Sequence, residues 1–555
     1  MSLQTAYADF QAGNFEAAET KLAALLMREP GNAQALHLAA MVAQRRGDLQ
    51  AALNRIQESL KSSDNAHEKL NTRGLILRAM GADVDSLLSF EAAAKFRPNY
   101  VPARINHART LLETSQPVEA AEAFRALIPL SDEPAMHRGL VHALIESNQL
   151  DAAEAALEAS PLEPADASAF RARLAFYRGE YETAVGEAAK ATNREANGPG
   201  PFSQALQVLR MSGGWDMAEG LIEDVLSKHP ARDRLWATAI TALHKAGDTD
   251  AALQLFGRAP RTLATLVARA EIANDQGHFA DAEQLALQAL DRQNGALPAM
   301  RVFALASLGQ EKWAQAQQIS DLALRAHPND QFFYAIKATA GRARGQDYGY
   351  YFNYDWVRSY DLDAPEGWAD MAAFNADLKA ELDALHGFSA APLDQTLRLG
   401  TQTAPDLRFV DSPAIKAYFK AVAPALDDYV SRLPRQGGHV LLRRNTGAWR
   451  IRSAWSIRLG AGGHHVDHVH PEGWVSSAYY VDVPDLPGKQ GWIKFGEPPI
   501  DIGQGPEHEV QPVAGRLVLF PSYLWHGTYP IEGDATRMTL PIDILPARPA
   551  QGPTS

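Results

Sequence analysis

The chain has 555 residues and a mass of 60.4 kDa, a length that predicts about two to four domains rather than one. It carries 53 Lys and Arg against 66 Asp and Glu, and the resulting net charge of −13 argues against general binding to nucleic acid or to anionic membranes. Cysteine is absent, which excludes disulfides, thiol nucleophiles and thiolate metal sites, whereas His, Asp and Glu remain available as ligands.

The two ends of the chain predict neither targeting nor membrane insertion. Residues 1–21 lack a basic start followed by an apolar run, so no secretory signal is expected there. No apolar run is long enough to span a bilayer. We therefore expect a cytoplasmic protein without membrane partners, and we expect the Pro- and Ser-containing tail, residues 549–555, to be disordered.

A helical unit repeats through the first half of the chain. Gly13, Gly47 and Gly81 are spaced 34 residues apart, and Ser115 takes the same place in the next unit. Between these marks apolar residues recur every three or four positions, as in helices with one buried face. A helical hairpin of about 34 residues is the tetratricopeptide signature, and residues 1–343 resemble that repeat family.

The tetratricopeptide resemblance implies an all-α superhelix with a concave groove. Such grooves bind extended chains, so we expect a protein or peptide partner there, with self-association of the superhelix as the alternative. Residues 344–435 lack the repeat and contain two amphipathic segments, residues 371–388 and 412–434, that predict helices. We expect this region to be a helical linker that supports the next domain.

From residue 436 to residue 548 the pattern changes to short runs rich in Val, Ile, Tyr, Trp and Phe, separated by Gly and Pro. The runs are residues 439–445, 448–459, 474–484, 491–498, 515–522 and 536–544. Such runs predict antiparallel strands of a sandwich or barrel. The whole chain is therefore expected to be an α + β multidomain protein.

Histidine gathers in this last region. Seven of the 17 histidines follow residue 435, and four of them lie in the run GGHHVDHVHP. In an extended segment residues i and i+2 face the same side, about 6.5 Å apart at Cα, so their side chains can converge on one ion. His468 and His470 have this spacing, as do His465 and Asp467.

A third ligand is expected from His526, which follows an apolar strand 58 positions after His468. A turn then leads into a returning strand that carries Arg537 and Thr539 on one face. Three ligands on one face leave positions open, the arrangement with which non-haem Fe(II) oxygenases bind a 2-oxo acid and dioxygen. Arg537 offers a permanent cation in fork geometry for the distal carboxylate of such an acid, and Thr539 offers a hydroxyl.

Three sequence blocks in order resemble the 2-oxoglutarate and Fe(II)-dependent oxygenase superfamily over about residues 440–545. They are Trp455 and Gly462 followed by HVHP at 468–471 and SSAYY at 476–480, then GRLVLFPSYLWH at 515–526, then RMT at 537–539. The resemblance implies a double-stranded β-helix (jelly roll) that holds Fe(II) and uses 2-oxoglutarate as co-substrate in a dioxygenase (hydroxylase) reaction. It also implies that Arg537 pairs with the 2-oxoglutarate and that Tyr480 contacts its carboxylate.

The ligand set has two versions. The superfamily's His-x-Asp occurs literally as His465-Val466-Asp467, but the spacing from Gly462 favours His468 as the first ligand. We therefore expect the set to be His468, His470 and His526, with His465 and Asp467 as the alternative pair. His464 and His508 are expected at the surface.

Two other functions stay open at this point. A cupin-type metal enzyme shares the fold, but Trp474 and Val475 stand where its motif needs a Glu, and Arg537 would have no role. A non-catalytic tetratricopeptide scaffold with a degenerate β-helix domain is the second. No motif encodes the substrate, and the attached superhelix favours a protein or peptide.

Overall fold

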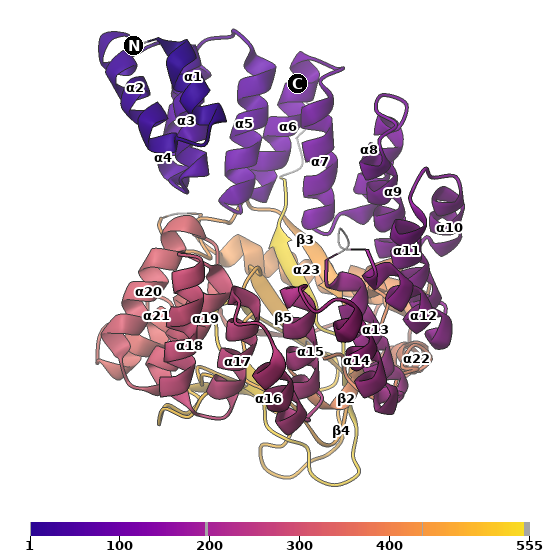
Figure 1. The fold of residues 1–555 in the computed structure, drawn as a ribbon. Coiled ribbons are helices and arrows are strands. Elements are labelled where there is room, and N and C mark those ends of the chain that lie inside the picture. Colours follow the sequence, from indigo (N-terminus) through magenta and orange to yellow (C-terminus); the bar gives the residue numbers. More distant parts are fainter. Residues whose placement is uncertain (1, 195–197, 394, 436, 549–555) are drawn as a thin grey trace. The chain divides into compact units, whose positions relative to one another are not determined.

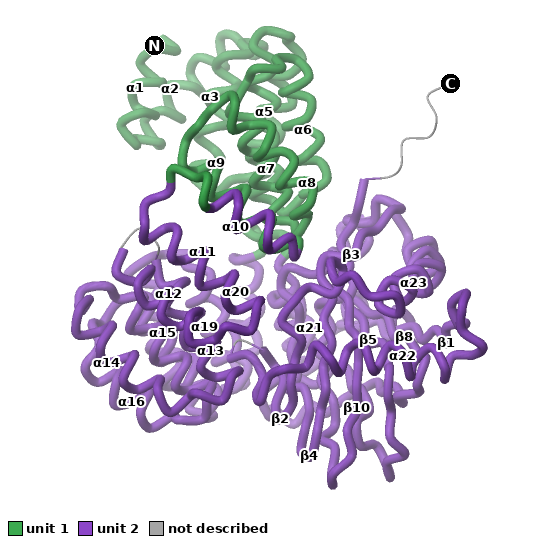
Figure 2. The backbone as a smooth tube through the Cα atoms, turned by 90° about the vertical axis from the view of Figure 1, so that its right-hand side faces the viewer, with its two compact units in different colours: residues 1–147, 158–161, 324–329 green, residues 148–157, 162–323, 330–555 purple. Residues whose placement is uncertain are grey.

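The computed structural model describes residues 2–194, 198–393, 395–435 and 437–548. The chain divides into two compact units (Figure 2). The first comprises residues 1–147, 158–161 and 324–329, and the second comprises residues 148–157, 162–323 and 330–555. The tail at 549–555, predicted to be disordered, lies outside the described residues.

The first unit is a stack of helical hairpins (Figure 1). Its helices are α1 (Leu3–Gln11), α2 (Phe15–Arg28), α3 (Ala33–Arg45), α4 (Leu49–Ser59), α5 (Ala66–Ala79), α6 (Asp83–Phe96), α7 (Val101–Glu113), α8 (Pro117–Leu127) and α9 (Pro134–Glu146).

The second unit opens with more hairpins of the same kind. They are α10 (Leu150–Glu158), α11 (Pro164–Tyr177), α12 (Tyr181–Thr192), α13 (Gly200–Ser212), α14 (Ala218–Lys228), α15 (Asp233–Lys245), α16 (Thr249–Arg258), α17 (Leu263–Asp275), α18 (Phe279–Arg292), α19 (Leu297–Gly309), α20 (Trp313–Ala326) and α21 (Gln331–Ala343), with a 3₁₀ turn η2 (Trp215–Met217). The predicted tetratricopeptide-like superhelix is confirmed.

The residue at each hairpin turn explains the 34-residue spacing. Gly47 ends α3 with φ +82°, and the next residue, Asp48, caps α4 by accepting a hydrogen bond from the Ala51 amide. A left-handed residue after a helix reverses the chain, and glycine adopts that conformation without a Cβ clash. Ser115, which replaces the glycine, has φ +58°, so the same turn is kept at some cost.

The region between the hairpins and the β-domain contains both predicted helices and also two strands. Its elements are η3 (Tyr354–Trp356), β1 (Arg358–Asp361), α22 (Met371–Asp383), β2 (Leu397–Gln402), η4 (Leu407–Phe409) and α23 (Pro413–Arg432). Strand β1 pairs with β8 and β2 pairs with β4, so this linker also extends the sheet, which its sequence pattern did not indicate.

The rest of the described chain forms two antiparallel sheets. The strands are β3 (Trp449–Ala454), β4 (Ile457–His465), β5 (Val475–Asp482), β6 (Ile493–Phe495), β7 (His508–Val510), β8 (Arg516–Pro521), β9 (His526–Thr528), β10 (Arg537–Thr539) and β11 (Ile542–Pro546). One sheet has the order β1-β8-β5-β10-β4-β2, with β11 joined to β5 and β3, and the other has the order β7-β6-β9. The predicted jelly-roll architecture is confirmed.

One predicted strand is wrong. Residues 439–445 form a turn, because the Arg443 amide donates to the His439 carbonyl and the Leu441 amide donates to the His439 Nδ1. The Asn445 side chain also donates to the Val430 and Leu433 carbonyls at the end of α23. Local side-chain bonds of this kind compete with strand pairing. Among the described helices none combines the length and the apolar character needed to cross a bilayer.

Candidate metal centre

Backbone pairing brings two distant segments together at the candidate centre. His468 and His470 lie in the extended segment after β4, and His526 begins β9. The His468 amide donates to the His526 carbonyl at 2.9 Å, and the His526 amide donates to the His468 carbonyl at 3.0 Å. This reciprocal pair of bonds sets the two imidazoles side by side although 58 residues separate them.

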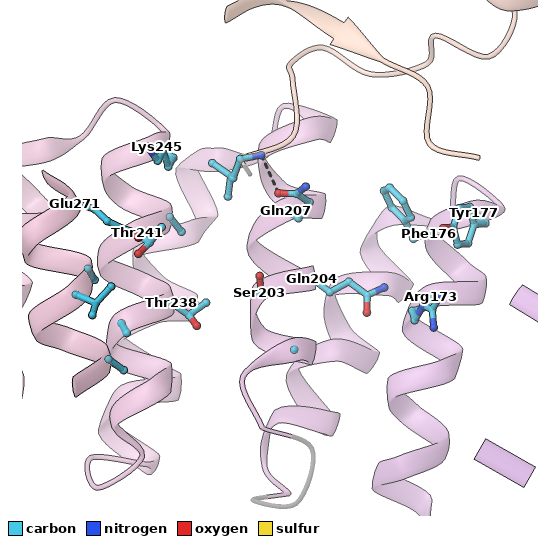
Figure 3. A pocket seen from close by; sticks show the side chains of 17 residues that line it. Arg173, Phe176, Tyr177, Ser203, Gln204, Gln207, Thr238, Thr241, Lys245 and Glu271 are labelled. Atoms are coloured by element: carbon cyan, nitrogen blue, oxygen red, sulfur yellow. Dashed lines mark hydrogen bonds between the residues drawn. The ribbon is translucent and has the colours of Figure 1, made fainter. Parts of the chain in front are cut away.

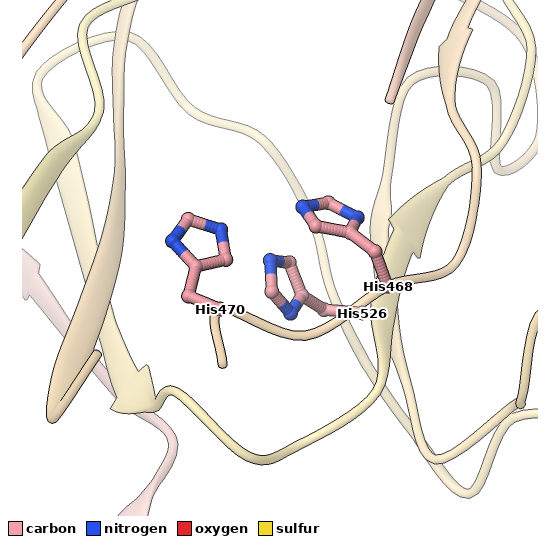
Figure 4. Close-up of side chains that lie close together, drawn as sticks. All are labelled: His468, His470 and His526. Atoms are coloured by element: carbon pink, nitrogen blue, oxygen red, sulfur yellow. The ribbon is translucent and has the colours of Figure 1, made fainter. Parts of the chain in front are cut away.

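The three imidazoles face a common point (Figure 4). The ring centroids of His468 and His526 are 4.2 Å apart, and each of these rings lies 5.2 Å from the ring of His470. One ligand nitrogen from each residue lies within 4.8 Å of the other two. Among the described residues, the sequence-predicted set of His468, His470 and His526 is thus brought together as one group.

Hydrogen bonds orient two of the rings for ligation. The Nδ1 of His468 lies 2.8 Å from the Val466 carbonyl, and the Nδ1 of His526 lies 2.9 Å from the Leu524 carbonyl. A carbonyl oxygen accepts only, so each Nδ1 carries the hydrogen, and the lone pair of a neutral ring is then on Nε2. Fixing the outer nitrogen in this way is how proteins orient metal-ligating histidines.

The third ring is held by a carboxylate that was not predicted from the sequence. The Nδ1 of His470 lies 2.8 and 2.9 Å from the two carboxylate oxygens of Asp543 on β11. Asp543 also accepts a hydrogen bond from the Ser476 hydroxyl at 3.0 Å. Burial alone would raise the pKa of Asp543, but His470 and this hydrogen bond hold it below its usual range. Asp543 therefore stays anionic and orients His470.

Burial keeps two of the rings, those of His468 and His526, without charge. Burial, reinforced by the neighbouring His470, lowers the pKa of His468 to about 3. Burial also lowers the pKa of His526 well below its usual range, and the side chain is only 6% exposed. Neutral imidazoles with a free Nε2 are the form that binds a transition metal.

The alternative pair stands outside this group. The Asp467 carboxylate pairs with the Lys494 ammonium at 2.8 Å, and burial raises the pKa of Asp467 to about 6. Its other oxygen lies where a Cβ on Gly527 would approach to 2.6 Å, so the glycine after His526 leaves room for this carboxylate. His465 stacks on His468 with centroids 6.1 Å apart, and its Nδ1 lies 3.3 Å from the Thr396 hydroxyl.

Arg537 is a buried guanidinium without an acidic partner. It is 2% exposed, donates from one terminal nitrogen to the Gly491 carbonyl, and leaves its Nε buried without a hydrogen bond. In the described part of the chain no carboxylate lies within ion-pair distance of it. Burial lowers the pKa of Arg537 from its very high usual value, and its positive charge contributes to the lowered pKa of His465. A buried cation without a counter-ion fits an anionic ligand.

Tyr480 and Thr539 accompany Arg537. The guanidinium carbon lies 5.7 Å from the centre of the Tyr480 ring, and the Tyr480 hydroxyl is buried without a hydrogen-bond partner. Burial raises the pKa of Tyr480 to about 12, so the hydroxyl keeps its proton. Thr539 is two positions after Arg537 on β10 and is 5% exposed. The neighbouring Tyr479 points elsewhere, because its hydroxyl donates to the Asn375 side chain on α22.

The two histidines expected at the surface are half-buried instead. His464 places its Nδ1 2.9 Å from the Gly462 carbonyl, and His508 stacks on Tyr354 with ring centroids 5.7 Å apart. Neither is among the three that converge. Thr396, which lies just before β2, was not predicted either: its hydroxyl is 3.5 Å from the Nε2 of His468. Only the unexpected pairing of β2 with β4 brings it there.

Residues 453–543 match the family model described as "Putative 2OG-Fe(II) oxygenase". The match spans the three clustered histidines, Arg537 and Asp543, so this oxygenase-like domain is similar to that family over its whole candidate centre. Residues 146–271, within the helical hairpins, match the model described as "Bacterial transcriptional activator domain". No curated protein matches the sequence.

Three solved structures resemble the helical part. They are a pilF structure from Pseudomonas aeruginosa (19% identity, 36% of this chain, 93% of that chain, TM-score 0.31), yeast Tom70 (12%, 62%, 88%, 0.33) and a tetratricopeptide repeat protein from Parabacteroides merdae (15%, 55%, 96%, 0.30).

Proposed function

We propose that this chain is a 2-oxoglutarate- and Fe(II)-dependent dioxygenase that hydroxylates a protein or peptide recruited by its helical repeats. The observation that carries the proposal is the pairing of two features in one domain. Three imidazoles converge, each with its Nδ1 hydrogen-bonded, and in the described residues a buried guanidinium of the same domain has no carboxylate partner. The match of residues 453–543 to the oxygenase family supports the same function.

The residues present fit the metal. His468, His470 and His526 would hold Fe(II) through their Nε2 atoms. When bound, Fe(II) supplies the activation of dioxygen that is coupled to oxidation of 2-oxoglutarate to succinate and carbon dioxide. Three neutral ligands leave the ion's charge uncompensated, and the buried Asp543 carboxylate on His470 provides an anion one hydrogen bond away.

The residues present also fit the co-substrate. Arg537 would pair with the distal carboxylate of 2-oxoglutarate in a charge-assisted bond, which gives its buried charge a counter-ion. Tyr480 keeps its hydroxyl proton and has no partner for it, so it can donate to the same carboxylate. Thr539, on the same strand as Arg537, would add a second hydroxyl.

Apolar side chains keep water from this region. Ile457, Leu459 and Ile531 belong to one buried cluster beside β10, and the Phe520 ring lies 4.6 Å from the His526 ring. A dry pocket strengthens the electrostatic contacts to the co-substrate and protects a reactive oxidant from solvent.

Two further features stay predictions. They are the domain limits, at residues 1–343, 344–435 and 436–548, and the cytoplasmic location.

The test is succinate formation by the purified chain. Protein supplied with Fe(II), 2-oxoglutarate and air should release succinate even without substrate, and a chelator should stop the release. The His468→Ala variant should release none. If the wild-type chain binds neither Fe(II) nor 2-oxoglutarate, the oxygenase proposal is wrong and a tetratricopeptide scaffold remains. Captured partners treated with active enzyme should gain the mass of one oxygen.

A further inference from the structure

A cationic cavity lies between two repeat helices and the sheet of the second unit. It has a volume of ≈ 930 Å³ and is walled by the C-terminal parts of α13 and α15 on one side and by β2 and β4 on the other. Four permanent cations line it, Arg210, Lys245, Arg398 and Arg458, against the single carboxylate of Asp275. A basic cavity is notable in a chain with a net charge of −13.

Two of these cations are neutralised within the protein. The Lys245 ammonium lies 3.0 Å from the Asp275 carboxylate, which also receives the His244 Nε2 at 2.9 Å. Arg458 lies 3.2 Å from the Asp383 carboxylate on α22. These ion pairs hold the walls of the cavity in place. Because Lys245 and Arg458 already have carboxylate partners, they contribute little positive charge to the binding of a ligand.

Arg210 and Arg398 differ from Lys245 and Arg458 in their lack of a carboxylate partner among the described residues. Among the described residues neither has a carboxylate within ion-pair distance, and both are half-buried. Arg398 donates to the carbonyls of Gln395 and Leu397, at 3.0 and 3.1 Å. A half-buried guanidinium pair without counter-ions favours an anionic ligand, and guanidinium matches carboxylates in bidentate geometry.

A second cavity on the repeat helices adjoins the first. It has a volume of ≈ 650 Å³, runs over α11, α13, α15 and α17, and shares Lys245 and Leu393 with the first. Figure 3 shows the amides of Gln204 and Gln207 and the hydroxyl of Thr238 on its walls. Together the two cavities have a larger volume than a single small anion needs, and they can accommodate a peptide.

A segment of the protein itself shows how these helices hold a main chain. The Leu393 amide donates to the Gln207 side-chain oxygen at 2.9 Å (Figure 3), and the Ser389 amide donates to the Met211 carbonyl at 2.9 Å. The Phe388 ring stacks on Phe176 with centroids 5.6 Å apart. The end of the groove therefore binds backbone amides.

Strand β2 connects this cavity to the candidate metal centre. Arg398 on β2 lines the cavity, and Thr396, two residues earlier, lies 3.5 Å from His468. We propose that the cavity is an exosite that binds an acidic segment, rich in Asp or Glu, of the protein substrate. That the bound peptide is a substrate rests on the proposed function, whereas the binding of an acidic peptide to this cavity does not.

The experiment measures peptide binding to the full chain without Fe(II) or 2-oxoglutarate. The probe is a fluorescein-labelled peptide of about eight residues that alternates Glu with Gly, compared by anisotropy with its Gln and Lys versions. The Glu peptide should bind at least about tenfold more tightly than the other two, and the affinity should fall with salt. Equal binding of the Glu and Gln peptides overturns the proposal.

A pair of variants locates the binding. Arg210→Gln combined with Arg398→Gln should weaken binding of the Glu peptide about tenfold or more. Arg234→Gln, an exposed position at the other end of α15, is the matched control and should leave it unchanged. Unchanged binding of the Glu peptide by the double variant overturns the assignment of the site. The assignment is also overturned if inorganic phosphate or an oligonucleotide displaces the labelled peptide and unlabelled Glu peptide does not. Succinate release, measured separately, shows whether a failure belongs to the exosite or to the oxygenase.

Discussion

The turn residues of the helical repeats are positioned by neighbours in the chain, whereas the histidines of the candidate metal centre are positioned by residues distant in sequence. In the repeats, a turn residue such as Gly47 is placed by the two helices next to it in the chain. At the centre, His468 is placed by His526, and His470 is placed by Asp543 from a strand 73 residues away. The turn of the repeats occurs many times along the chain, so a substitution at one turn is tolerated. The long-range contacts that position the histidines of the centre occur once. The largest effects of substitution are therefore expected at the centre.

The largest effect is expected for His526→Ala. Removing one of three ligands should weaken metal binding by more than about 100-fold, because loss of an outer partner alone commonly costs 10- to 100-fold. Calorimetric titration with Mn(II) measures this. His508→Ala removes a half-buried histidine outside the group and should bind Mn(II) as the wild type does. Equal loss in both variants would contradict the assignment.

The second largest effect is expected for Arg537→Gln. It removes a buried charge that lacks an internal partner, so 2-oxoglutarate binding to the Mn(II)-loaded protein should weaken by about 2–5 kcal/mol while Mn(II) affinity is kept. Arg516→Gln, at a partly exposed arginine paired with Asp361, is the control and should have no such effect. Unchanged co-substrate affinity in Arg537→Gln would remove the role given to this residue.

The seam between β2 and β4 should be sensitive to acid. His386 is buried between the Thr401 and Ser456 hydroxyls, and burial, with the nearby Arg458, lowers its pKa to about 4. The unfolded chain, with a pKa near 6.5, binds the proton more readily. Stability is therefore full above about pH 6.5 and falls as the pH drops toward 4, by an amount on the order of 3 kcal/mol.

Thermal unfolding between pH 7 and pH 5 tests this effect. The melting temperature of the wild type should fall with pH, and the His386→Gln variant, which keeps polar partners for the two hydroxyls, should show a smaller fall. Equal slopes for both proteins would show that His386 does not carry the pH dependence.

The smallest effect is expected in the repeats. Gly47→Ala places a Cβ at φ +82° and should lower the free energy of unfolding by about 1 kcal/mol without changing Mn(II) affinity. Gly186→Ala, in the middle of the exposed face of α12, should instead raise it by about 0.5–1 kcal/mol. Denaturant titration gives both values, and the same sign for the two variants would contradict the turn argument.

The features that could be predicted from the sequence are those set by residues close together in the chain, as in the repeats. The repeats were predictable because the turn glycines and the helical period are both local, and even Ser115 keeps the left-handed turn. Residues 439–445 misled because their apolar run matches a strand, whereas bonds from Asn445 and within the segment hold a turn. Strand β1, with the polar sequence RSYD, is recognisable only by its pairing with β8.

At the centre, the spacing of the histidines left two ligand pairs open, and the spacing from Gly462 in the family resemblance favoured the set that converges, His468, His470 and His526. Asp543 was missed although it is a lone carboxylate on the apolar strand β11, because its partner depends on the pairing of β11 with β5. The cavity with Arg210 and Arg398 was also out of reach, since it needs a repeat helix and β2 to face each other. The sequence predicted that His526 would join His468 and His470, but it did not predict that Asp543 would hold His470 or that Arg210 would share a cavity with Arg398.

The most direct measurement is anomalous diffraction from crystals of the full chain grown with Mn(II) and 2-oxoglutarate without oxygen. The account predicts one strong metal peak bound by the Nε2 atoms of His468, His470 and His526, with the 2-oxoglutarate carboxylate on Arg537. A peak on His465 and Asp467, or no peak at the three histidines, would contradict this assignment.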